Sequence, residues 1–250
     1  MKERKYNIKF LNDCLLIKDV LIVSDLHIGY DEQIYGDSIF PKIIINNILE
    51  KLDNILYDLD NLNIKIKKFI LLGDIKDNFG NINKTEWREI LLLIDYIKNK
   101  MNNPKIIVIK GNHDKILSPI LKKRNILMRN YYKFKLNKKI YYFFHGDKIF
   151  KNCLNSDYLI FGHIHPAITL KNKYKHEKFK CFLVGNINKK KFIVLPSFSD
   201  IRYGYNLNNL KNLNYNFSFI NIKMLNESNV IIYNDDEKKE YNFGKLKHFI

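Results

Sequence analysis

Short apolar runs recur along the first two-thirds of the chain, and five of them lead directly into polar clusters. Runs of four or five consecutive apolar residues are typical of strands that are buried on both faces. The pattern therefore predicts five strands, over residues 20–23, 69–72, 106–109, 140–144 and 158–161.

Two longer segments between these runs place apolar residues at helical spacing. Residues 41–59 begin at Pro41, which suits the first turn of a helix, and residues 85–98 have the same periodicity. The residues that share one face are Ile44, Ile48, Leu52 and Ile55 in the first segment, and Trp87, Ile90, Leu91, Ile94 and Ile97 in the second. Because strands and helices alternate, we expect a largely parallel sheet sandwiched by helices.

The pattern changes after residue 166, where short apolar segments follow one another without long helices between them. These segments predict antiparallel strands that close the fold, over residues 179–185, 191–196, 216–223 and 229–233, with a strand and turn over 240–246. No linker, internal repeat or low-complexity tract divides the sequence. We therefore expect one α/β domain over 1–250, with a core over 20–200 that the strands of 201–250 complete.

A polar cluster follows each of the five predicted strands. In open α/β sheets, ligands bind at the carboxyl ends of the strands, so we expect the clusters to meet on one rim. Five of the seven histidines lie in them, together with several carboxylates. The clusters are Asp25-Leu26-His27, Gly73-Asp74-Ile75-Lys76-Asp77, Gly111-Asn112-His113-Asp114, His145-Gly146-Asp147 and Gly162-His163-Ile164-His165.

The residue types in these clusters indicate a metal site. Imidazole and carboxylate together form a ligand set that suits manganese, iron, zinc or a similar metal. No cysteine belongs to the clusters, which disfavours a closed structural zinc site. The alternative is a set of unrelated loop residues. That alternative leaves unexplained why every cluster ends a strand and why glycine adjoins the polar residue in four of the five.

The clusters follow, in order, the pattern DxH, GDxxD, GNH[DE], a single His and GHxH, and over residues 20–166 the chain therefore resembles the calcineurin-like metallophosphoesterases. The likeness continues more loosely to residue 200, where Leu195-Pro196-Ser197-Phe198 is similar to the closing strand of small prokaryotic members. Within the family, DLHIG, GHIHP and LPSF resemble the branch of the SbcD-type repair nuclease. The resemblance implies a four-layer α-β-β-α sandwich, with mixed sheets and the metal site at the carboxyl ends of the strands.

The resemblance also implies two divalent metal ions, with manganese expected and iron, zinc, nickel or cobalt as alternatives. The first ion would be bound by Asp25, His27, Asp74 and His165, and the second by Asp74, Asn112, His145 and His163. A carboxylate can bridge two cations through its two oxygens, whereas a neutral imidazole cannot bridge through one nitrogen. A hydroxide shared by the metals would attack the phosphorus of a phosphodiester in line.

The resemblance gives two further residues a catalytic role. His113 would face the leaving-group oxygen, as a general acid or a cationic hydrogen-bond donor. Asp77 would orient His113, and the alternative is that Asp77 only caps the turn after its strand. Asp114 and Asp147 are expected to fix their loops through local backbone hydrogen bonds.

The formal net charge is +17, from 43 Lys and Arg against 26 Asp and Glu, and two segments carry nearly all of it. Residues 122–139 sum to +8 and residues 171–191 to +7, with aromatic residues interleaved. One interpretation is an electrostatic track that leads a nucleic-acid backbone to the metals. The other is a pair of solvated strand edges, where lysine prevents pairing between molecules. The candidate track residues are Lys133, Lys135, Lys171, Lys173 and Lys175.

These observations favour a metal-dependent phosphoesterase that cleaves phosphodiesters, with DNA or RNA as the leading substrate. The alternative enzyme is a small-molecule or cyclic-nucleotide phosphodiesterase or phosphatase on the same centre. The alternative of another class is a noncatalytic binding module that keeps the fold. The complete motif set, with His113 present, disfavours this last alternative.

The sequence also gives expectations about location and partners. Cys14, Cys153 and Cys181 form no CxxC pair and predict free thiols in a reducing cytoplasm. No signal-peptide core and no membrane-spanning stretch is present in the sequence. Because only 50 residues follow Asp200, we expect a self-standing hydrolase rather than a nuclease coupled to a partner ATPase. The C-terminal strands could pair within the chain or across a homodimer.

Overall fold

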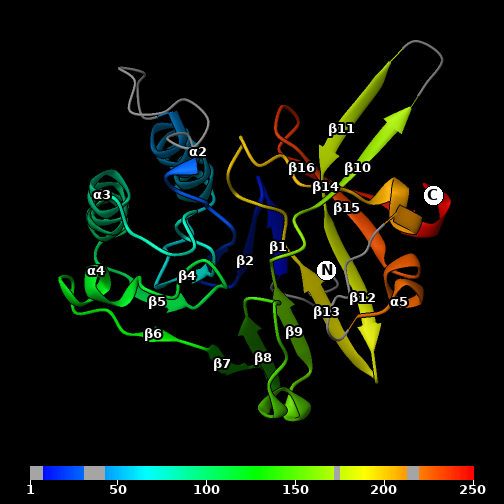
Figure 1. The fold of residues 1–250 in the computed structure, drawn as a ribbon. Coiled ribbons are helices and arrows are strands. Elements are labelled where there is room, and N and C mark those ends of the chain that lie inside the picture. Colours follow the sequence, from blue (N-terminus) through cyan, green and yellow to red (C-terminus); the bar gives the residue numbers. More distant parts are fainter. Residues whose placement is uncertain (1–7, 31–42, 172–174, 213–219) are drawn as a thin grey trace.

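The computed structural model describes residues 8–30, 43–171, 175–212 and 220–250, and two β-sheets packed face to face form its centre (Figure 1). The first sheet has six strands, in the spatial order β1 (Ile8–Leu11), β2 (Cys14–Ile17), β3 (Val20–Val23), β4 (Lys68–Leu72), β5 (Lys105–Ile109) and β6 (Met128–Arg129). Strands β3 to β6 are parallel, whereas β1 and β2 are antiparallel additions at one edge.

The second sheet has seven strands and is mixed. Their spatial order is β16 (Lys239–Lys245), β15 (Asn229–Asn234), β12 (Phe182–Ile187), β13 (Lys190–Val194), β9 (Tyr158–Phe161), β8 (Lys139–Phe144) and β7 (Tyr131–Leu136). Strands β13, β9 and β8 are parallel, and the other pairings are antiparallel. The five strands that precede the polar clusters are therefore divided between two sheets, three in the first and two in the second.

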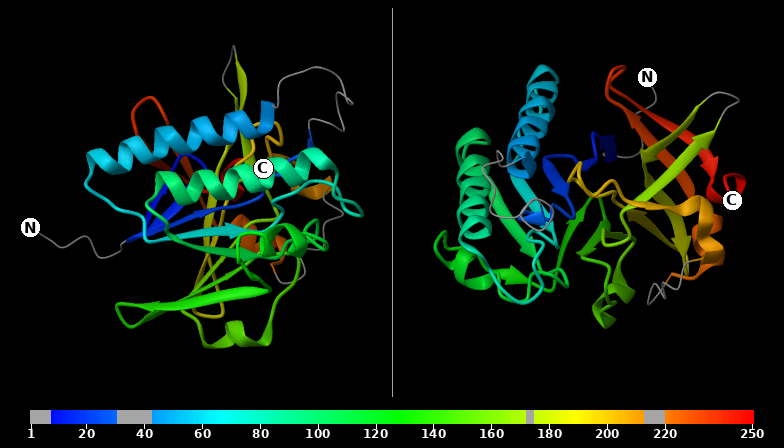
Figure 2. Two further views of the ribbon diagram at one scale, coloured as in Figure 1. Left: turned by 90° about the vertical axis from the view of Figure 1, so that its left-hand side faces the viewer. Right: turned by 45° about the horizontal axis from the view of Figure 1, so that its top comes forward.

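Alternating side chains of the strands build the apolar layers. In β3, Ile22 packs between the two sheets, whereas Val23 packs on the opposite face against the helices. Helices α2 (Ile43–Asn61) and α3 (Lys84–Lys100) cover that outer face of the first sheet (Figure 2). Strands β3 and β4 are consequently buried on both sides, which is why their sequences are continuously apolar.

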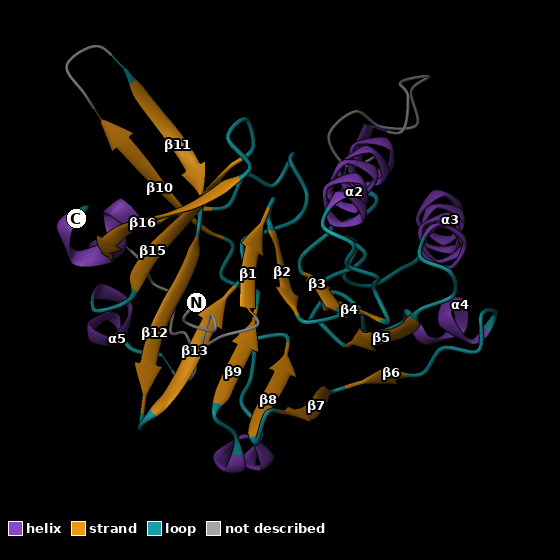
Figure 3. Ribbon diagram, turned by 180° about the vertical axis from the view of Figure 1, so that it is seen from behind, coloured by secondary structure: helices purple, strands orange, loops and turns teal. Residues whose placement is uncertain are grey.

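Shorter elements cover the outer face of the second sheet (Figure 3). They include helix α5 (Ile222–Asn226) and a three-stranded sheet of β11 (His176–Lys180), β10 (Pro166–Lys171) and β14 (Tyr205–Asn206). The remaining short elements are helix α4 (Ser118–Lys122) and the 3₁₀ helices η1 (Lys151–Asn155), η2 (Leu207–Asn212) and η3 (Leu246–His248). The sandwich with mixed sheets is confirmed, and its fourth layer is built from short elements instead of long helices.

The strands predicted before the polar clusters and both long helices are confirmed, although the expected helix start at Pro41 lies outside the described residues. The segment 179–185 is two strands of different sheets, because β11 ends at Lys180 and β12 begins at Phe182. Buried Cys181 lies between them, and the single polar residue beside it, Lys180, is compatible with one alternating strand.

Two further segments differ from the predicted strands. Residues 195–198 form a loop beyond β13. Of residues 216–223, those up to 219 lie outside the described part, and Ile222 begins helix α5, which Asn221 caps through Met224 N. Among the helices in the described part of the chain, none is both long and apolar enough to cross a membrane.

Candidate metal centre

The loops that follow β3 and β4 lie side by side and carry two of the predicted clusters. Backbone hydrogen bonds continue the parallel pairing beyond the strands. Asp25 N donates to Gly73 O at 3.1 Å, and His27 N donates to Asp74 O at 3.0 Å. These bonds fix the two loops against each other, so their side chains project from one framework.

Five of the predicted ligands have a left-handed backbone, which residues other than glycine adopt only at a steric cost. The φ angles are 57° at Asp25, 49° at His27, 48° at Asp74, 67° at His163 and 47° at His165. Residues held in this way cost on the order of 1–3 kcal/mol each and cluster at functional sites. These backbone bends bring the side chains of residues with one residue between them, such as Asp25 and His27, into the same donor group.

The first donor group combines Asp25, His27 and His165, whose ligand atoms lie within 4.8 Å of one another. His165 Nε2 is 3.1 Å from Asp25 Oδ1 and 3.3 Å from His27 Nε2. Asp25 Oδ2 accepts hydrogen bonds from Ser24 Oγ at 2.6 Å and His163 N at 3.0 Å. These bonds turn Asp25 Oδ1 toward the two imidazoles, so the group can hold one cation.

The second donor group combines Asp74, His145 and His163. His145 Nε2 is 3.3 Å from Asp74 Oδ2 and 3.1 Å from His163 Nδ1, and Asn112 Oδ1 lies 3.0 Å from the same nitrogen. His145 Nδ1 lies 3.1 Å from Leu72 O, and a carbonyl oxygen can only accept. The proton of a neutral His145 is therefore on Nδ1, which leaves the Nε2 lone pair facing the group.

Asp74 lies between the two groups. Its Oδ1 accepts a hydrogen bond from His113 N at 2.9 Å. Its Oδ2 is 3.3 Å from His145 Nε2 and 4.0 Å from His27 Nε2, so this carboxylate contacts donors of both groups. A carboxylate that bridges two cations must lie between the other ligands of those cations, as Asp74 does.

The donor set fits divalent cations. Asp25 Oδ1 is buried and makes no hydrogen bond with any residue that the structure describes. Imidazole nitrogens face each other across 3.3 Å between His27 and His165, and across 3.1 Å between His145 and His163. Lone pairs and carboxylate oxygens that converge in a buried place are favourable when a cation compensates them.

The charges of the centre shift the pKa values of its carboxyl groups. Burial by itself raises the pKa of Asp25, but the neighbouring His165 holds it below the usual range, and His145 does the same for Asp74. Burial lowers the pKa of His145, yet the Asp74 carboxylate outweighs it and raises that pKa to about 10. Both carboxyl groups are therefore ionised at neutral pH, as metal binding requires, whereas His145 keeps a second proton that a bound cation would displace from Nε2.

Two glycines allow the loops to approach one another. A Cβ on Gly162 would collide with Ser24 Oγ, and a Cβ on Gly111 would collide with Asp74 Oδ1. The glycines beside the predicted ligands are thus explained by close contacts between the loops, as the sequence indicates.

Asp114 joins the cluster after β5 to the cluster after β4. Its Oδ2 accepts from Gly111 N at 3.0 Å, and its Oδ1 accepts from Ile75 N at 3.0 Å. Burial, together with the Asp74 charge, raises the pKa of Asp114 to about 7. Asp114 therefore fixes its loop through backbone hydrogen bonds, as predicted, and also ties that loop to a neighbouring one.

His113 lies at the edge of the centre, and the structure differs from the expectation about its orientation. Its Nδ1 contacts the backbone carbonyl oxygen of Asp77, not the carboxylate. The Asp77 carboxylate accepts instead from His27 Nδ1 at 2.9 Å and from Arg202 at 2.7 Å. Asp77 thus orients His113 through its backbone and the ligand His27 through its side chain.

Arg202 is a site residue that the sequence pattern did not reveal. It lies in the loop after β13, 125 positions from its partner Asp77, and its guanidinium lies 4.2 Å from the ring centre of Tyr30. Arg202 lines a cleft of about 580 Å³ together with members of both donor groups, namely His27 and His165 of the first and Asp74 and His163 of the second. Aromatic side chains also line this cleft, namely those of Tyr30, Phe79, Tyr203 and Tyr205.

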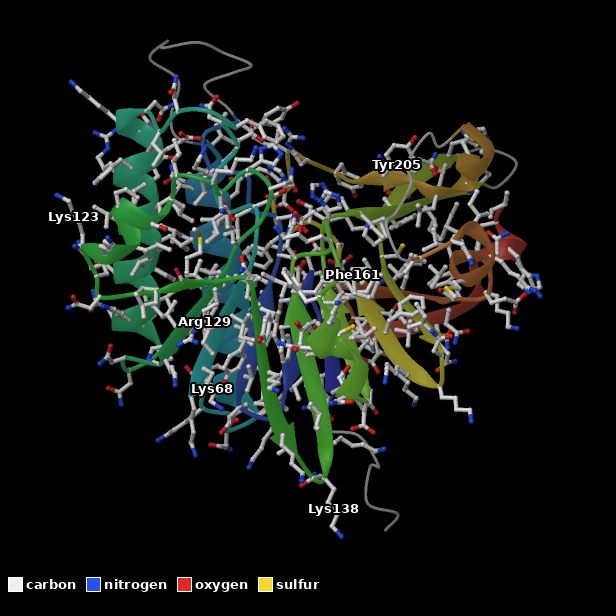
Figure 4. The ribbon with its side chains drawn as sticks, turned by 60° about the horizontal axis from the view of Figure 1, so that its bottom comes forward. Lys68, Lys123, Arg129, Lys138, Phe161 and Tyr205 are labelled. Atoms are coloured by element: carbon white, nitrogen blue, oxygen red, sulfur yellow. The ribbon has the colours of Figure 1, made fainter. Side chains whose placement is uncertain are left out.

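The basic segment 122–139 does not lead toward the centre. Its candidate residues Lys133 and Lys135 lie on β7, an edge strand, opposite Tyr142 and Ile140 of β8. At about 3.3 Å per residue, Ile140 lies roughly 16 Å before His145 along β8. In Figure 4, Lys138 at the hairpin turn points away from the cleft residue Tyr205. This placement favours the solvated-edge interpretation for Lys133 and Lys135.

Strand β10 starts directly after His165 and runs outward with β11 as a two-stranded arm (Figure 1), so the basic segment 171–191 begins at the outer end of β10. Lys171 ends β10, Lys175 pairs with Glu177 at 2.9 Å, and Lys173 lies outside the described residues. Other lysines of the segment hold the protein together, since Lys180 pairs with Asp13 and Asp200, and Lys178 donates to Gly204 O.

The family model for the calcineurin-like phosphoesterases matches residues 18–242. A match over most of the chain, on this fold and with this donor set, defines a metal-dependent phosphoesterase. The chain belongs to the calcineurin-like phosphoesterase family. Among curated proteins, none matches the sequence significantly.

A similar solved structure shows the same fold. The chain is similar to the nuclease MPE of Pseudomonas putida, with a TM-score of 0.57 and 18% identity over 93% of this chain and 94% of that one. It is also similar to YfcE, a phosphoesterase from E. coli, with a TM-score of 0.44 and 12% identity over 90% and 98%. An archaeal phosphodiesterase gives a TM-score of 0.37 and 13% identity over 90% and 98%.

Proposed function

We propose that the protein hydrolyses phosphodiester bonds of nucleic acid with two divalent cations, manganese being the expected ion. The observation that carries this proposal is the position of Asp74 between two donor groups. Asp25, His27 and His165 would hold the first cation, and Asn112, His145 and His163 the second, with Asp74 shared. When bound, such a pair lowers the pKa of a coordinated water and offsets the charge of the phosphoryl oxygens.

The surrounding residues determine what else the site can do. Because the Asp77 carbonyl oxygen only accepts, His113 must keep a proton on Nδ1, and its Nε2 is the atom that exchanges a proton. Asp74 Oδ2 lies 3.8 Å from that nitrogen. His113 can then donate from Nε2 to the oxygen that leaves phosphorus.

Three observations support nucleic acid over a small molecule. Strand β10 of the arm begins directly after the cleft residue His165, the aromatic lining of the cleft offers flat surfaces to bases, and Arg202 supplies a cation at its wall. The DLHIG and GHIHP motifs resemble a repair nuclease, and a similar solved structure is a nuclease. A small-molecule phosphodiesterase on the same centre remains the alternative that the experiment distinguishes.

The test is an activity screen with added Mn²⁺ that compares an aryl phosphodiester, cyclic nucleotides, and single- and double-stranded DNA. We expect cleavage of DNA, and a loss of that activity when a chelator removes the metal. Cleavage of the small substrates alone would overturn the nucleic-acid proposal. No cleavage with Mn²⁺ or with the other candidate ions would favour a noncatalytic module.

We place the protein in the cytoplasm as a self-standing enzyme. The support is that Cys14, Cys153 and Cys181 are buried and free, as thiols are in a reducing compartment. Strands β16 and β7 end the second sheet, so a homodimer through either edge is a specific alternative to a monomer. Size-exclusion chromatography with light scattering distinguishes the two states.

A further inference from the structure

Phe79 is an exposed aromatic residue at the metal centre. It lies between β4 and α3, lines the cleft, and exposes 56% of its surface. The sheets and helices bury most of the large apolar side chains, whereas more than half of the surface of Phe79 is exposed. An exposed aromatic ring inside a polar cleft is typical of a surface that binds a ligand.

The position of the ring is fixed on one side of the centre. Its centroid lies 3.6 Å from that of His113, with 32° between the ring planes. One face of Phe79 therefore packs on His113, and its exposed surface is available to the cleft. Under the proposed function His113 faces the leaving group, so Phe79 lies on the leaving-group side of the scissile bond.

The rest of the cleft indicates which chemistry fits beside the phosphate. Tyr203 and Tyr205 expose 46% and 36% of their surfaces, and Arg202 adds a planar cation beside Tyr30. Flat π surfaces and a guanidinium are the groups that stack on nucleobases. A sugar or an alkyl group offers no planar face to stack against, so a nucleobase uses this lining more fully.

We propose that Phe79 is the stacking platform for the nucleobase on the leaving-group side of the scissile phosphodiester. This proposal rests on the proposed function and names the subsite that recognises its substrate. The ring of Phe79 packs on His113 and on the base at once, so binding of the base also holds His113 near the leaving oxygen. Stacking of one base on an aromatic side chain corresponds to roughly a tenfold change in affinity.

The test compares two substrates in the presence of Mn²⁺. One is dithymidine monophosphate, and the other is the same molecule with an abasic deoxyribose as its leaving group. Phe79→Ala should raise KM about tenfold for the first substrate and less than about twofold for the second, whereas Phe79→Trp should keep both values. The matched control is Phe243→Ala, since Phe243 is 42% exposed on β16, outside the cleft lining. Equal losses on both substrates, in kcat or in KM, would overturn the proposal and leave Phe79 as a support for His113.

A binding measurement separates this proposal from the proposed function. Phe79→Trp adds a fluorophore to a chain whose only tryptophan is Trp87. Thymidine monophosphate should quench the added fluorescence, deoxyribose 5-phosphate should not, and the wild type provides the Trp87 baseline. If the wild type cleaves neither substrate, the proposed function fails, yet selective quenching still supports the platform. Absence of selective quenching overturns it.

Discussion

Asp74 contacts donors of both groups, so its substitution tests whether two cations share a ligand. In Asp74→Asn the amide oxygen can still accept from His113 N, but the negative charge is lost. We expect the protein to bind fewer than two Mn²⁺ ions and affinity to fall by at least about tenfold. Isothermal titration calorimetry measures both quantities. Asp53→Asn on α2 is the control, and an unaltered stoichiometry in Asp74→Asn would contradict the bridge.

His113 lies beside the donor groups and is proposed to act on the leaving group. His113→Ala should keep the metal content, because the two groups that would hold the ions do not require this side chain. Turnover of a phosphodiester should fall by about 10²–10⁴-fold, the usual contribution of a positioned acid. Elemental analysis and steady-state kinetics check the two parts. Unchanged turnover would remove His113 from the mechanism.

Arg202 acts on the metal centre through two hydrogen-bonded residues. It donates to Asp77, which in turn accepts from the ligand His27. We expect Arg202→Ala to weaken Mn²⁺ binding about tenfold, as loss of an outer partner does in other metal sites, and Arg202→Lys to recover part of it. Calorimetry of metal binding is the measurement. If both variants bind metal like the wild type, Arg202 has no part in holding His27.

At this scale the sequence predicted which side chains converge but not the geometry of their convergence. The predicted ligands meet because each follows a strand, and strand ends are readable from apolar runs. The left-handed backbone at Asp25 or His163 leaves no pattern, because the same residue types also occur in ordinary loops. The pair of Arg202 and Asp77 joins positions 125 residues apart and depends on tertiary packing alone.

Four elements are joined by a cluster of charges in which Lys51, Lys180 and Asp13 are largely buried and Asp200 is exposed. Lys51 of α2 lies 2.5 Å from Asp13 in the turn after β1 and 3.0 Å from Asp200 beyond β13, and Lys180 of β11 contacts the same two carboxylates at 2.9 and 3.0 Å. Glu50, Asp235, Tyr203 and Tyr233 line the adjoining cavity. Because Lys51 and Lys180 also donate to the carbonyls of residues 198 and 199, the cluster positions the loop that carries Arg202.

The cluster predicts a pH-dependent contribution to stability. Burial opposes ionisation of Asp13, but Lys180 and Lys51 lower its pKa, and the carboxylates raise the pKa of Lys51 above its usual range. A lowered carboxyl pKa stabilises the fold above about pH 4, and that contribution is lost as the pH falls through the folded-state pKa. The raised lysine pKa stabilises below about pH 10.5, and its contribution is lost as the pH rises through the folded-state pKa.

Lys51→Met should therefore destabilise the protein by about 3 kcal/mol at neutral pH, since it leaves a buried carboxylate with one partner fewer. The difference from the wild type should shrink below pH 3. Urea unfolding across pH measures it. Lys100→Met removes an exposed pair with Asp53 and should cost less than about 1 kcal/mol, so equal effects of both changes would contradict the prediction.

The prediction of a helix or strand succeeded where all residues of that element lie in the same environment. Strands β3 and β4 are buried along their length, so their apolar runs show where they begin and end. The segment 179–185 failed because the chain changes sheets at Cys181, and the single polar residue beside it, Lys180, also fits one alternating strand. The strand predicted over residues 216–223 failed at Ile222 because residues 220–223 have a strand-like composition. Asn221 caps a helix there, and only the packed structure reveals that geometry.

At the scale of the whole molecule, the charge of +17 is distributed differently from a continuous track. The hairpin of β7 and β8 points away from the cleft, whereas the arm of β10 and β11 starts at it. Affinity for a single-stranded DNA should fall with salt at a slope of at least about 1.4, which corresponds to two phosphate contacts. Lys171→Ala with Lys175→Ala should reduce this slope, and Lys133→Ala with Lys135→Ala should not. Titration by fluorescence anisotropy at several salt concentrations decides, and equal slopes for the two double variants would contradict a role for the arm.

If the five predicted ligands bind metal as proposed, their left-handed backbone opposes selection for stability to selection for function. Glycine adopts that backbone without steric cost, so glycine at Asp25, His27, Asp74, His163 or His165 would relieve on the order of 1 kcal/mol. The change that most relaxes each loop is thus the one that deletes a ligand. A lineage that no longer needs the metal is free to drift toward glycine at these positions and gain heat resistance. The identity of these five residues in a descendant protein would therefore show whether that protein still depends on the metal.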